Sequence, residues 1–197
     1  MADEWDEYAD GWDDDPGARA YAAAAFTSLQ DELGARDMSL DGLRVLDFGC
    51  GTGLLTERMV ASVASIDAVD SSPAMLDVLD AKIEQRQWAQ VTPARTIRAG
   101  RATHDLVVCS SVCSFLDDYP GTVVKLADLL RPGGLFVQWD WERDDNDADP
   151  HGLSRAEIAA ALTAAGLTDI DARVAFEVRF GDQVMRPLIG AGRVAAS

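Results

Sequence analysis

A glycine-rich string and a later acidic residue are the parts of this chain whose residue types and spacing could do chemistry. The string Asp47-Phe-Gly-Cys-Gly-Thr-Gly53 places glycine at every second position. Glycine adopts the positive φ values that a sharp turn needs, and its missing side chain lets a ligand approach the backbone. Asp47 adds a carboxylate that can accept a hydrogen bond from a ligand ammonium group or a neighbouring amide. The string therefore predicts a ligand-binding turn.

The later acidic residue is Asp70, which lies 17 residues beyond Gly53 in the sequence VDSSPAML. Its two acceptor oxygens suit the two hydroxyl groups of a ribose. A dinucleotide-binding turn needs the spacing G-x-G-x-x-G, which would place the third glycine at position 54. Leu54 stands there instead, so the spacing disfavours an NAD-dependent oxidoreductase.

Strand-like and helix-like segments alternate from residue 44 to residue 166, and these elements must position the two groups. Short apolar runs between turn signals predict strands, while helix formers that follow capping residues such as Ser72 predict helices. The expected strands are 44–48, 65–70, 91–97, 105–111, 135–141, 169–180 and 187–196. The expected helices are 18–34, 54–62, 72–85, 122–130 and 154–166, the last with a Ser154–Glu157 capping box.

This order of elements predicts an α/β fold with a doubly wound, mostly parallel seven-stranded sheet and an antiparallel C-terminal edge strand. Such a sheet binds ligands beyond the carboxyl ends of its strands, and the glycine string follows the first strand there. The sequence contains no internal repeat and no linker. We therefore expect residues 1–197 to form a single domain, with a helical region over 1–40 and a core over 44–197.

The motifs together resemble those of the class I methyltransferases, which use S-adenosylmethionine. The string from Asp47 to Gly53 resembles their motif I, D-x-G-x-G-x-G, without a gap. Asp70 and the Ser-Pro-x-Met helix start that follows are similar to their ribose-binding segment. Residues 105–118 and 126–141 look like their fourth strand and the Arg-Pro-Gly-Gly turn into their fifth strand. The resemblance implies a Rossmann-like core, S-adenosyl-L-methionine as cofactor and S-adenosyl-L-homocysteine as product.

The resemblance also implies a set of cofactor-binding residues. They are Tyr21, Asp47, Gly49, Cys50, Gly51, Gly53, Leu54, Asp70, Ser71, Met75, Thr96, Ser110 and Ser111. One region departs from the family, which often has an acidic residue after the third strand that accepts a hydrogen bond from the adenine amino group. Residues 92–104 contain no carboxylate, so Thr96 and backbone carbonyls are the expected acceptors for adenine.

Methyl transfer from a sulfonium mainly requires that the acceptor be positioned and desolvated, because the donor is already activated. A general base is needed only for a weak nucleophile. His151 follows the fifth strand and is the candidate for that role, with a solvated loop histidine as the alternative. His104 precedes the fourth strand, at the opposite edge of the sheet, and is interpreted as a loop residue.

Aromatic residues lie where the acceptor would bind, and the resemblance implies that the region 1–40 forms a lid over donor and acceptor. The candidates for the substrate pocket are Tyr8, Trp12, Phe115, Trp139 and Trp141. Their ring faces suit a flat organic substrate or a sulfonium cation. For Trp139 and Trp141 the alternative is core packing, since successive strand residues face opposite sides of a sheet.

The formal net charge is -17, with 34 acidic and 17 basic residues. Such a field repels nucleic acid and anionic membranes, so the expected partner is a small molecule. The acidic N-terminus does not look like a secretory leader, and no run of about 18 apolar residues is present, so we expect a cytoplasmic protein. The acidity fits either adaptation to high salt or a GC-rich genome. The oligomeric state is left open.

Three cysteines stand at positions 50, 109 and 113, without a CxxC motif. This spacing predicts buried thiols rather than a disulfide framework or a zinc site, and a nucleophilic cysteine is the alternative. No metal is expected.

Two functions from different classes remain after these observations. The first is a methyltransferase that acts on a nucleophilic O, N, S or C of a small molecule. The second is a non-catalytic regulator or partner subunit that binds the same cofactor. No Asn-Pro-Pro-Tyr-like string follows the fourth strand, where the sequence from Cys109 to Cys113 is CSSVC, and this argues against amide or base N-methylation.

Overall fold

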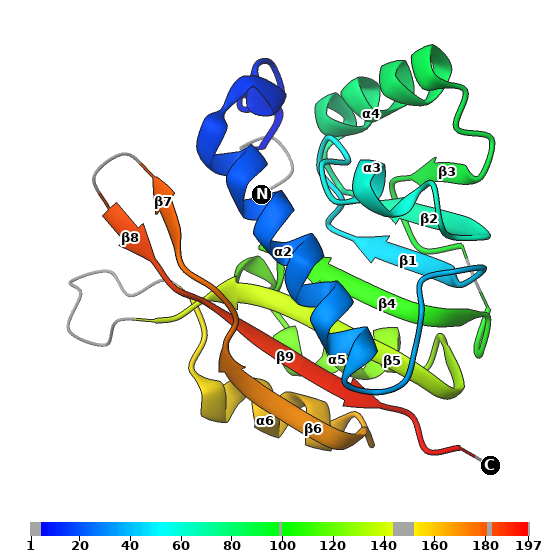
Figure 1. Cartoon of the computed structure of the whole chain (residues 1–197), viewed down its shortest axis with the longest axis vertical. Coiled ribbons are helices and arrows are strands. Elements are labelled where there is room, and N and C mark those ends of the chain that lie inside the picture. Colours follow the sequence, from blue (N-terminus) through cyan, green and yellow to red (C-terminus); the bar gives the residue numbers. More distant parts are fainter. Residues whose placement is uncertain (1–4, 99, 144–151, 181–182, 197) are drawn as a thin grey trace. The chain divides into compact units, whose positions relative to one another are not determined.

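The computed structural model describes residues 5–98, 100–143, 152–180 and 183–196. The chain divides into two compact units, Met1–Arg98 and Ala99–Ser197. We describe each unit by itself, and the expectation of a single domain stays a prediction. Figure 1 labels the elements of both units.

The first unit begins with a short 3-10 helix, η1 (Trp12–Asp14), and the long helix α2 (Pro16–Gly34). Helix α2 starts two residues earlier than expected because Asp15 caps it. The Asp15 carboxylate accepts a hydrogen bond from the backbone N–H of Ala18 at 2.7 Å, and Pro16 fills the first helical position.

Three parallel strands form the sheet of the first unit. They are β1 (Arg44–Phe48), β2 (Ser65–Val69) and β3 (Val91–Ala94), in the order β3-β2-β1. Between them lie α3 (Thr56–Met59) and α4 (Pro73–Arg86), and α4 contacts β3 (Figure 1). The expected strand 44–48 is confirmed. Helix α3 is shorter than the expected 54–62 because backbone turns occupy both of its flanks.

The second unit has four strands in its main sheet and two helices. The strands are β4 (His104–Ser110), β5 (Leu130–Trp141), β6 (Thr168–Val174) and β9 (Pro187–Arg193), in the order β4-β5-β9-β6. The helices are α5 (Tyr119–Ala127) and α6 (Arg155–Ala164), with the 3-10 turn η2 (Cys113–Phe115) after β4. Strands β7 (Val178–Phe180) and β8 (Gln183–Met185) pair as a separate hairpin. The expected strand 169–180 is therefore two strands.

The antiparallel C-terminal strand β9 lies between β5 and β6, and not at the edge as expected. Residues 187–192 of β9 are apolar or small and all are buried, whereas β6 carries exposed polar residues that suit an edge strand. Gly190 of β9 also makes room for α6, since a Cβ there would lie 2.3 Å from Cγ2 of Ile158. With β1 to β3 these strands number seven, and the mostly parallel α/β fold class is confirmed.

Local capping signals explain how the helices of the second unit begin. Ser154 and Glu157 form the expected capping box of α6. Helix α5 starts at Tyr119, three residues before the expected 122, because the Asp118 carboxylate accepts a hydrogen bond from the N–H of Gly121. Helix α6 contacts α5, β6 and β9, as Figure 1 shows for the yellow, orange and red segments.

Candidate functional site

The glycine-rich loop between β1 and α3 is anchored on the neighbouring strand. The backbone N–H groups of Gly49 and Cys50 donate to the carbonyl oxygen of Val69 at 2.7 and 3.1 Å. The φ angles of Gly49, Gly51 and Gly53 are 75°, 53° and 83°, all in the left-handed region that favours glycine. The turn that the sequence predicts is therefore present.

The second and third glycines serve different purposes. A Cβ on Gly51 would meet only the Met75 Sδ atom, at 3.9 Å, so the loop leaves space there. A Cβ on Gly53 would lie 2.6 Å from Cδ1 of Leu79, a fully buried side chain of α4. Gly51 thus keeps the backbone open to a ligand, whereas Gly53 lets the loop pack against α4.

Asp70 is fixed beside this loop by two backbone amides. Its Oδ2 accepts a hydrogen bond from the N–H of Gly51 at 2.8 Å, and its Oδ1 accepts one from the N–H of Ser72 at 2.9 Å. The residue is half-buried, and each carboxylate oxygen has a second lone pair. The carboxylate is therefore oriented and can still accept hydrogen bonds from a pair of hydroxyl groups.

Asp47 is fully buried at the carboxyl end of β1. The Thr56 hydroxyl donates to its Oδ2 at 2.6 Å, and its Oδ1 has no hydrogen-bond partner among the described residues. Burial raises the pKa of Asp47 to about 6, the Thr56 hydrogen bond lowers it and the charge of Asp70 raises it. A buried acceptor without a donor is costly. This oxygen therefore fits a cationic ligand group such as an ammonium.

The remaining predicted cofactor residues of the first unit differ in position. Met75 is buried beside the glycine loop, and Leu54 is half-buried within it. Ser71 and Thr96 are exposed, Thr96 on the bend that follows β3. Tyr21 is buried in α2. The structure brings the glycines, Asp70 and Met75 together, while the role of Thr96 toward adenine stays a prediction.

Aromatic residues gather in the segment that precedes α2. The ring of Trp5 lies 5.9 Å from that of Tyr8 and 6.4 Å from that of Trp12, the latter edge to face. The Tyr8 residue is 55% exposed. The predicted contribution of Tyr8 and Trp12 to a substrate pocket stays a prediction.

In the second unit, the predicted cofactor residues Ser110 and Ser111 stand where β4 ends. Ser111 has a φ of 55°, an uncommon conformation for a residue with a side chain. Its N–H donates to the carbonyl oxygen of Trp139 at 2.8 Å. Its buried hydroxyl has no hydrogen-bond partner in the part of the chain that the structure describes. Backbone strain and an unpaired hydroxyl together are typical of a functional turn.

The three aromatic residues predicted for the second unit have different exposures. Trp139 has no exposed surface, so the core-packing interpretation holds for its side chain. Trp141 is half-buried, and Phe115 in η2 is 36% exposed. Only the last two have surface that a bound acceptor could contact in this structure.

Asp140 is a buried acid of β5 that was not among the residues predicted from the sequence. Its Oδ2 accepts a hydrogen bond from the N–H of Ser114 at 3.0 Å, and its Oδ1 accepts one from the N–H of Trp141 at 2.9 Å. Burial raises the pKa of Asp140. The carboxylate holds the η2 turn that carries Phe115. The sequence could have identified Asp140, because it is the single acidic residue in the mostly apolar run LFVQWDW.

The cysteines and histidines complete the predicted residues. Cys50, Cys109 and Cys113 are free and buried, which confirms the buried-thiol interpretation. Burial raises the pKa of Cys50, and a hydrogen bond with Cys109 together with burial raises that of Cys113. Neither is therefore a thiolate near neutral pH. His104 is the buried first residue of β4, rather than a loop residue, and His151 lies outside the described residues.

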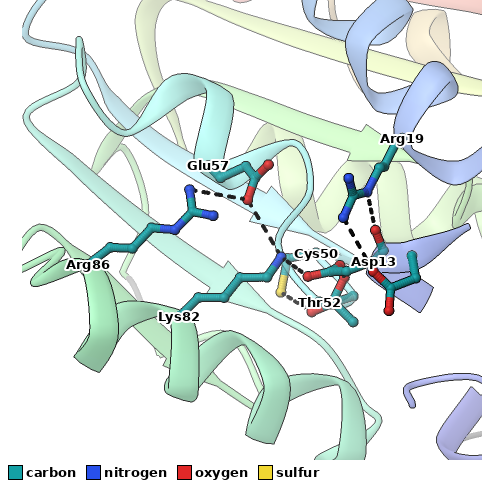
Figure 2. Close-up of polar contacts among 9 residues, drawn as sticks. Asp13, Arg19, Cys50, Thr52, Glu57, Lys82 and Arg86 are labelled. Carbon is teal, nitrogen blue, oxygen red and sulfur yellow. Dashed lines mark hydrogen bonds and ion pairs between the residues drawn. The ribbon is translucent and has the colours of Figure 1, made fainter. Parts of the chain in front are cut away.

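Four further residues of the first unit contact the site and were missed. Figure 2 shows Lys82 of α4, whose Nζ lies 2.5 Å from Oδ2 of Asp13 and 3.7 Å from Oε2 of Glu57. The Thr52 hydroxyl, in the glycine loop, donates to Oδ1 of Asp13 at 2.6 Å. Lys82 interrupts an apolar stripe of α4 at helical spacing, and this pattern in the sequence could have identified it as a buried lysine. Asp13 looked like any other member of an acidic run.

Asp6 is the fourth of these residues. The Ser72 hydroxyl donates to its Oδ1, and the N–H of Ala74 lies 3.4 Å from the same oxygen. The segment before α2 thus contacts both the glycine loop and the turn that follows Asp70.

Comparisons with known proteins identify similar sequences and similar folds. A family model described as a methyltransferase domain matches residues 46–136. The malonyl-[acyl-carrier protein] O-methyltransferase of Hahella chejuensis is 30% identical over 204 residues, which cover 89% of this chain and 72% of that protein. The enzyme of the same name from Halalkalibacterium halodurans is 35% identical over 122 residues, 58% of this chain and 45% of that protein.

Solved structures show the same fold. The 1,6-didemethyltoxoflavin-N1-methyltransferase of Burkholderia thailandensis, solved with 1,6-didemethyltoxoflavin and S-adenosylhomocysteine, has a TM-score of 0.71 and is 22% identical. The match covers 98% of this chain and 84% of that one. The chain spans only 39% to 72% of the length of three curated relatives that it matches.

The fold and the site define a Rossmann-like α/β protein. Its glycine loop forms a ligand-binding turn, and two carboxylates lie beside that turn. Together with the similarity to the Hahella chejuensis protein over most of the chain, the fold and the site show that the chain belongs to the family of class I S-adenosylmethionine-dependent methyltransferases.

Proposed function

We propose that this chain binds S-adenosylmethionine and transfers its methyl group to a small-molecule acceptor. The observation that carries the proposal is the pair of carboxylates around the glycine loop. Asp47 has a buried oxygen without a hydrogen-bond partner among the described residues, and Asp70 is oriented by two backbone amides. The first suits an ammonium group and the second suits a ribose diol, and both groups occur in this donor.

Each residue then has a defined task. The ionised Asp47 accepts hydrogen bonds from the amino group of the donor, and Asp70 holds its ribose hydroxyls. Gly51 keeps the backbone free of a side chain where the donor approaches. In the second unit, the buried Ser111 hydroxyl has no hydrogen-bond partner among the described residues and can bind a ligand, and Asp140 holds the turn that carries Phe115.

When bound, S-adenosylmethionine supplies a methyl group that is already activated by the positive sulfur. The chain must therefore exclude water and hold the acceptor in line, rather than activate the donor. Names of relatives in the family include malonyl-[acyl-carrier protein], ubiquinone-biosynthesis and trans-aconitate methyltransferases. Two of these names are O-methyltransferases, and they support oxygen nucleophiles as the first acceptors to test.

Direct binding and transfer measurements test the proposal. Isothermal titration calorimetry with S-adenosylmethionine and S-adenosylhomocysteine should show one site for each. A tritiated-methyl assay should then transfer label to at least one member of a panel of carboxylic acids, phenols and amines. No binding of either nucleoside would overturn the proposal. Binding without transfer to any acceptor would instead favour the non-catalytic regulator or partner subunit.

His151 is proposed as the general base for a weakly nucleophilic acceptor. The residue lies outside the described part of the chain, so the proposal rests on its position after β5 in the sequence. Replacement by alanine should lower kcat at least tenfold, in line with the typical contribution of general base catalysis. Unchanged turnover of His151→Ala would remove the role.

The surroundings of the protein are also a proposal. No helix among the described residues is long and apolar enough to cross a membrane. The net charge of -17 disfavours nucleic acid as a substrate and supports a small-molecule acceptor. A cytoplasmic location stays a prediction.

A further inference from the structure

Lys82 is an unusual residue for the position it holds in α4. Its side chain is only 11% exposed, and it follows Met75, Leu76 and Leu79 along the buried face of the helix. A lysine is rarely buried unless its charge is paired. Only two lysines occur in the whole chain, so a buried one beside the glycine loop calls for an explanation at that place.

The partners of Lys82 come from two different segments. Its Nζ lies 2.5 Å from Asp13, which belongs to η1, and 3.7 Å from Glu57 of α3 (Figure 2). Two carboxylates meet one ammonium group, and without it they would repel each other in a chain that already carries a net charge of -17. Lys82 therefore allows Asp13 to stay beside α3 and α4.

Asp13, which Lys82 holds in place, also contacts the glycine loop. Its second oxygen, Oδ1, accepts the hydrogen bond from Thr52, the residue between Gly51 and Gly53. The Arg19 side chain also donates to the backbone carbonyl of Asp13, which ties the same residue to α2. The chain of contacts runs from α4 through Asp13 to the centre of the loop.

A second carboxylate of the same segment holds the other half of the site. Asp6 accepts hydrogen bonds from Ser72 and Ala74, directly after Asp70. We call residues 5–15 the N-terminal strap. The strap contacts Thr52 in the glycine loop and the turn that follows Asp70, so it touches both parts of the proposed donor site.

We propose that Lys82 is a positioning residue for the donor site, which docks the N-terminal strap on the glycine loop through Asp13 and Thr52. Docking of the strap preorganises the loop and so raises the affinity for S-adenosylmethionine. The inference rests on the proposed function for its ligand, but the docking itself is a property of the chain alone.

Arg86 provides a matched control for Lys82. It lies one turn further along α4, carries the same charge and contacts the same Glu57 at 3.8 Å. Its side chain is 53% exposed, and Figure 2 shows it directed to Glu57 alone among the residues drawn. Lys82→Met and Arg86→Met therefore remove one positive charge from the same helix, but only the first breaks the link to Asp13.

The first measurement needs no donor. Hydrogen exchange followed by mass spectrometry on the free protein should show faster exchange in peptides covering the strap for Lys82→Met, and wild-type exchange for Arg86→Met. Lys82→Arg should restore protection because it keeps the charge. Wild-type protection of the strap in Lys82→Met would overturn the proposal.

The second measurement is donor binding by calorimetry. Lys82→Met should bind S-adenosylmethionine at least tenfold more weakly, with a raised KM for the donor, unchanged kcat and an unchanged KM for the acceptor. A purely structural role would lower kcat as well. Equal affinity in Lys82→Met and wild type would overturn this inference alone, whereas a wild-type protein that binds no donor would overturn the proposed function.

Asp13→Asn keeps an acceptor for Thr52 and removes only the charge, so it replaces Lys82→Met as the test variant should the latter not fold. The double variant Lys82→Met/Asp13→Asn should be no weaker in donor binding than the more affected single variant, because both changes break one link. Additive losses from the two changes would contradict the proposed link.

Discussion

Asp47 and Asp70 show how two identical side chains beside one loop acquire different properties. Asp70 is half-buried and accepts two backbone N–H groups, so its carboxylate is oriented where it can meet hydroxyl groups. Asp47 is fully buried and has one hydroxyl donor, so its charged form is costly until a cation arrives. The environment of each carboxylate, and not its type, decides which part of a ligand it suits.

The proposed ribose-binding role of Asp70 is testable by Asp70→Asn. The change keeps the size of the side chain but removes its charge and one acceptor oxygen. Hydrogen bonds to charged groups contribute about 1.5–3 kcal/mol, so S-adenosylmethionine should bind about 10- to 100-fold more weakly by calorimetry. Asp77→Asn, on the exposed side of α4, removes the same charge and should leave the affinity unchanged. Equal losses in both variants would point to a general effect of charge.

The role of Asp47 predicts a pH dependence of donor binding. Burial raises the pKa of Asp47 to about 6, so the carboxylate becomes protonated as the pH falls through that value. An ammonium group prefers the ionised form, so calorimetry should show weaker binding below pH 6, approaching about tenfold for each pH unit. Asp47→Asn should bind weakly and show no such step. A wild-type affinity that is constant between pH 5 and 7 would contradict the assignment.

The same pKa has the opposite consequence for the stability of the free protein. A folded-state pKa above the usual 3.8 means that the folded chain keeps a proton which the unfolded chain releases between about pH 4 and 6. The contribution of Asp47 to the free energy of unfolding therefore falls as the pH rises through this window.

At the scale of elements, the packing of α4 against the glycine loop connects the core to the site. Met75 lies under Gly51, Leu79 lies under Gly53, and Lys82 reaches Asp13. These three residues share one face of the helix, because successive members are three or four residues apart. A single helix face thus supports two glycines of the loop and Asp13, all of which belong to or contact the proposed donor site.

The contact between Gly53 and Leu79 predicts the effect of Gly53→Ala. The positive φ costs an alanine about 1–2 kcal/mol, and overpacking against Leu79 adds about 1–3 kcal/mol to the loss in the free energy of unfolding. Gly42 has a φ of 72°, and a Cβ added there would meet no atom within 4 Å, so Gly42→Ala should show only the first cost. Urea unfolding of the two variants measures the difference, and equal losses would show that Leu79 moves aside.

Most elements follow from local signals, and their errors have local explanations. Strand β1 has the predicted bounds because apolar residues lie between clear turn signals, and α6 starts at its capping box. Strand β9 was expected at an edge, yet it pairs with β5 and β6. Its place depends on glycines that admit α6 and Leu167, a contact that no local pattern contains.

At the scale of the whole molecule, the net charge of -17 is the dominant property. Three of the described ion pairs have both side chains exposed at the surface, where each contributes little. Repulsion between the excess carboxylates opposes folding at low ionic strength, and salt screens it, since the Debye length falls from about 10 Å at 0.1 M to about 3 Å at 1 M.

The charge predicts that added KCl stabilises the protein. Between about 0.1 and 2 M KCl the Tm should rise, by roughly 2–4 °C for each 1 kcal/mol that screening adds to the free energy of unfolding. Scanning calorimetry measures the change, and a protein of similar size and near-neutral charge serves as the control for general effects of KCl. A Tm that does not rise would favour the GC-rich genome as the source of the acidity.

The amino-acid sequence was sufficient to predict the glycine turn, the acidic residue at position 70, the family and most of the strands and helices. These features depend on residues that are neighbours in the chain, so spacing and caps are sufficient to predict them. Only the tertiary structure decided that Asp13 meets Thr52 across 39 residues and that Asp6 meets Ser72 across 66. It also buried Trp139, left Asp47 with an oxygen to which no described residue donates a hydrogen bond, and paired Lys82 with Asp13. These outcomes depend on which segments pack together, and that choice is made by the burial of apolar surface over the chain as a whole.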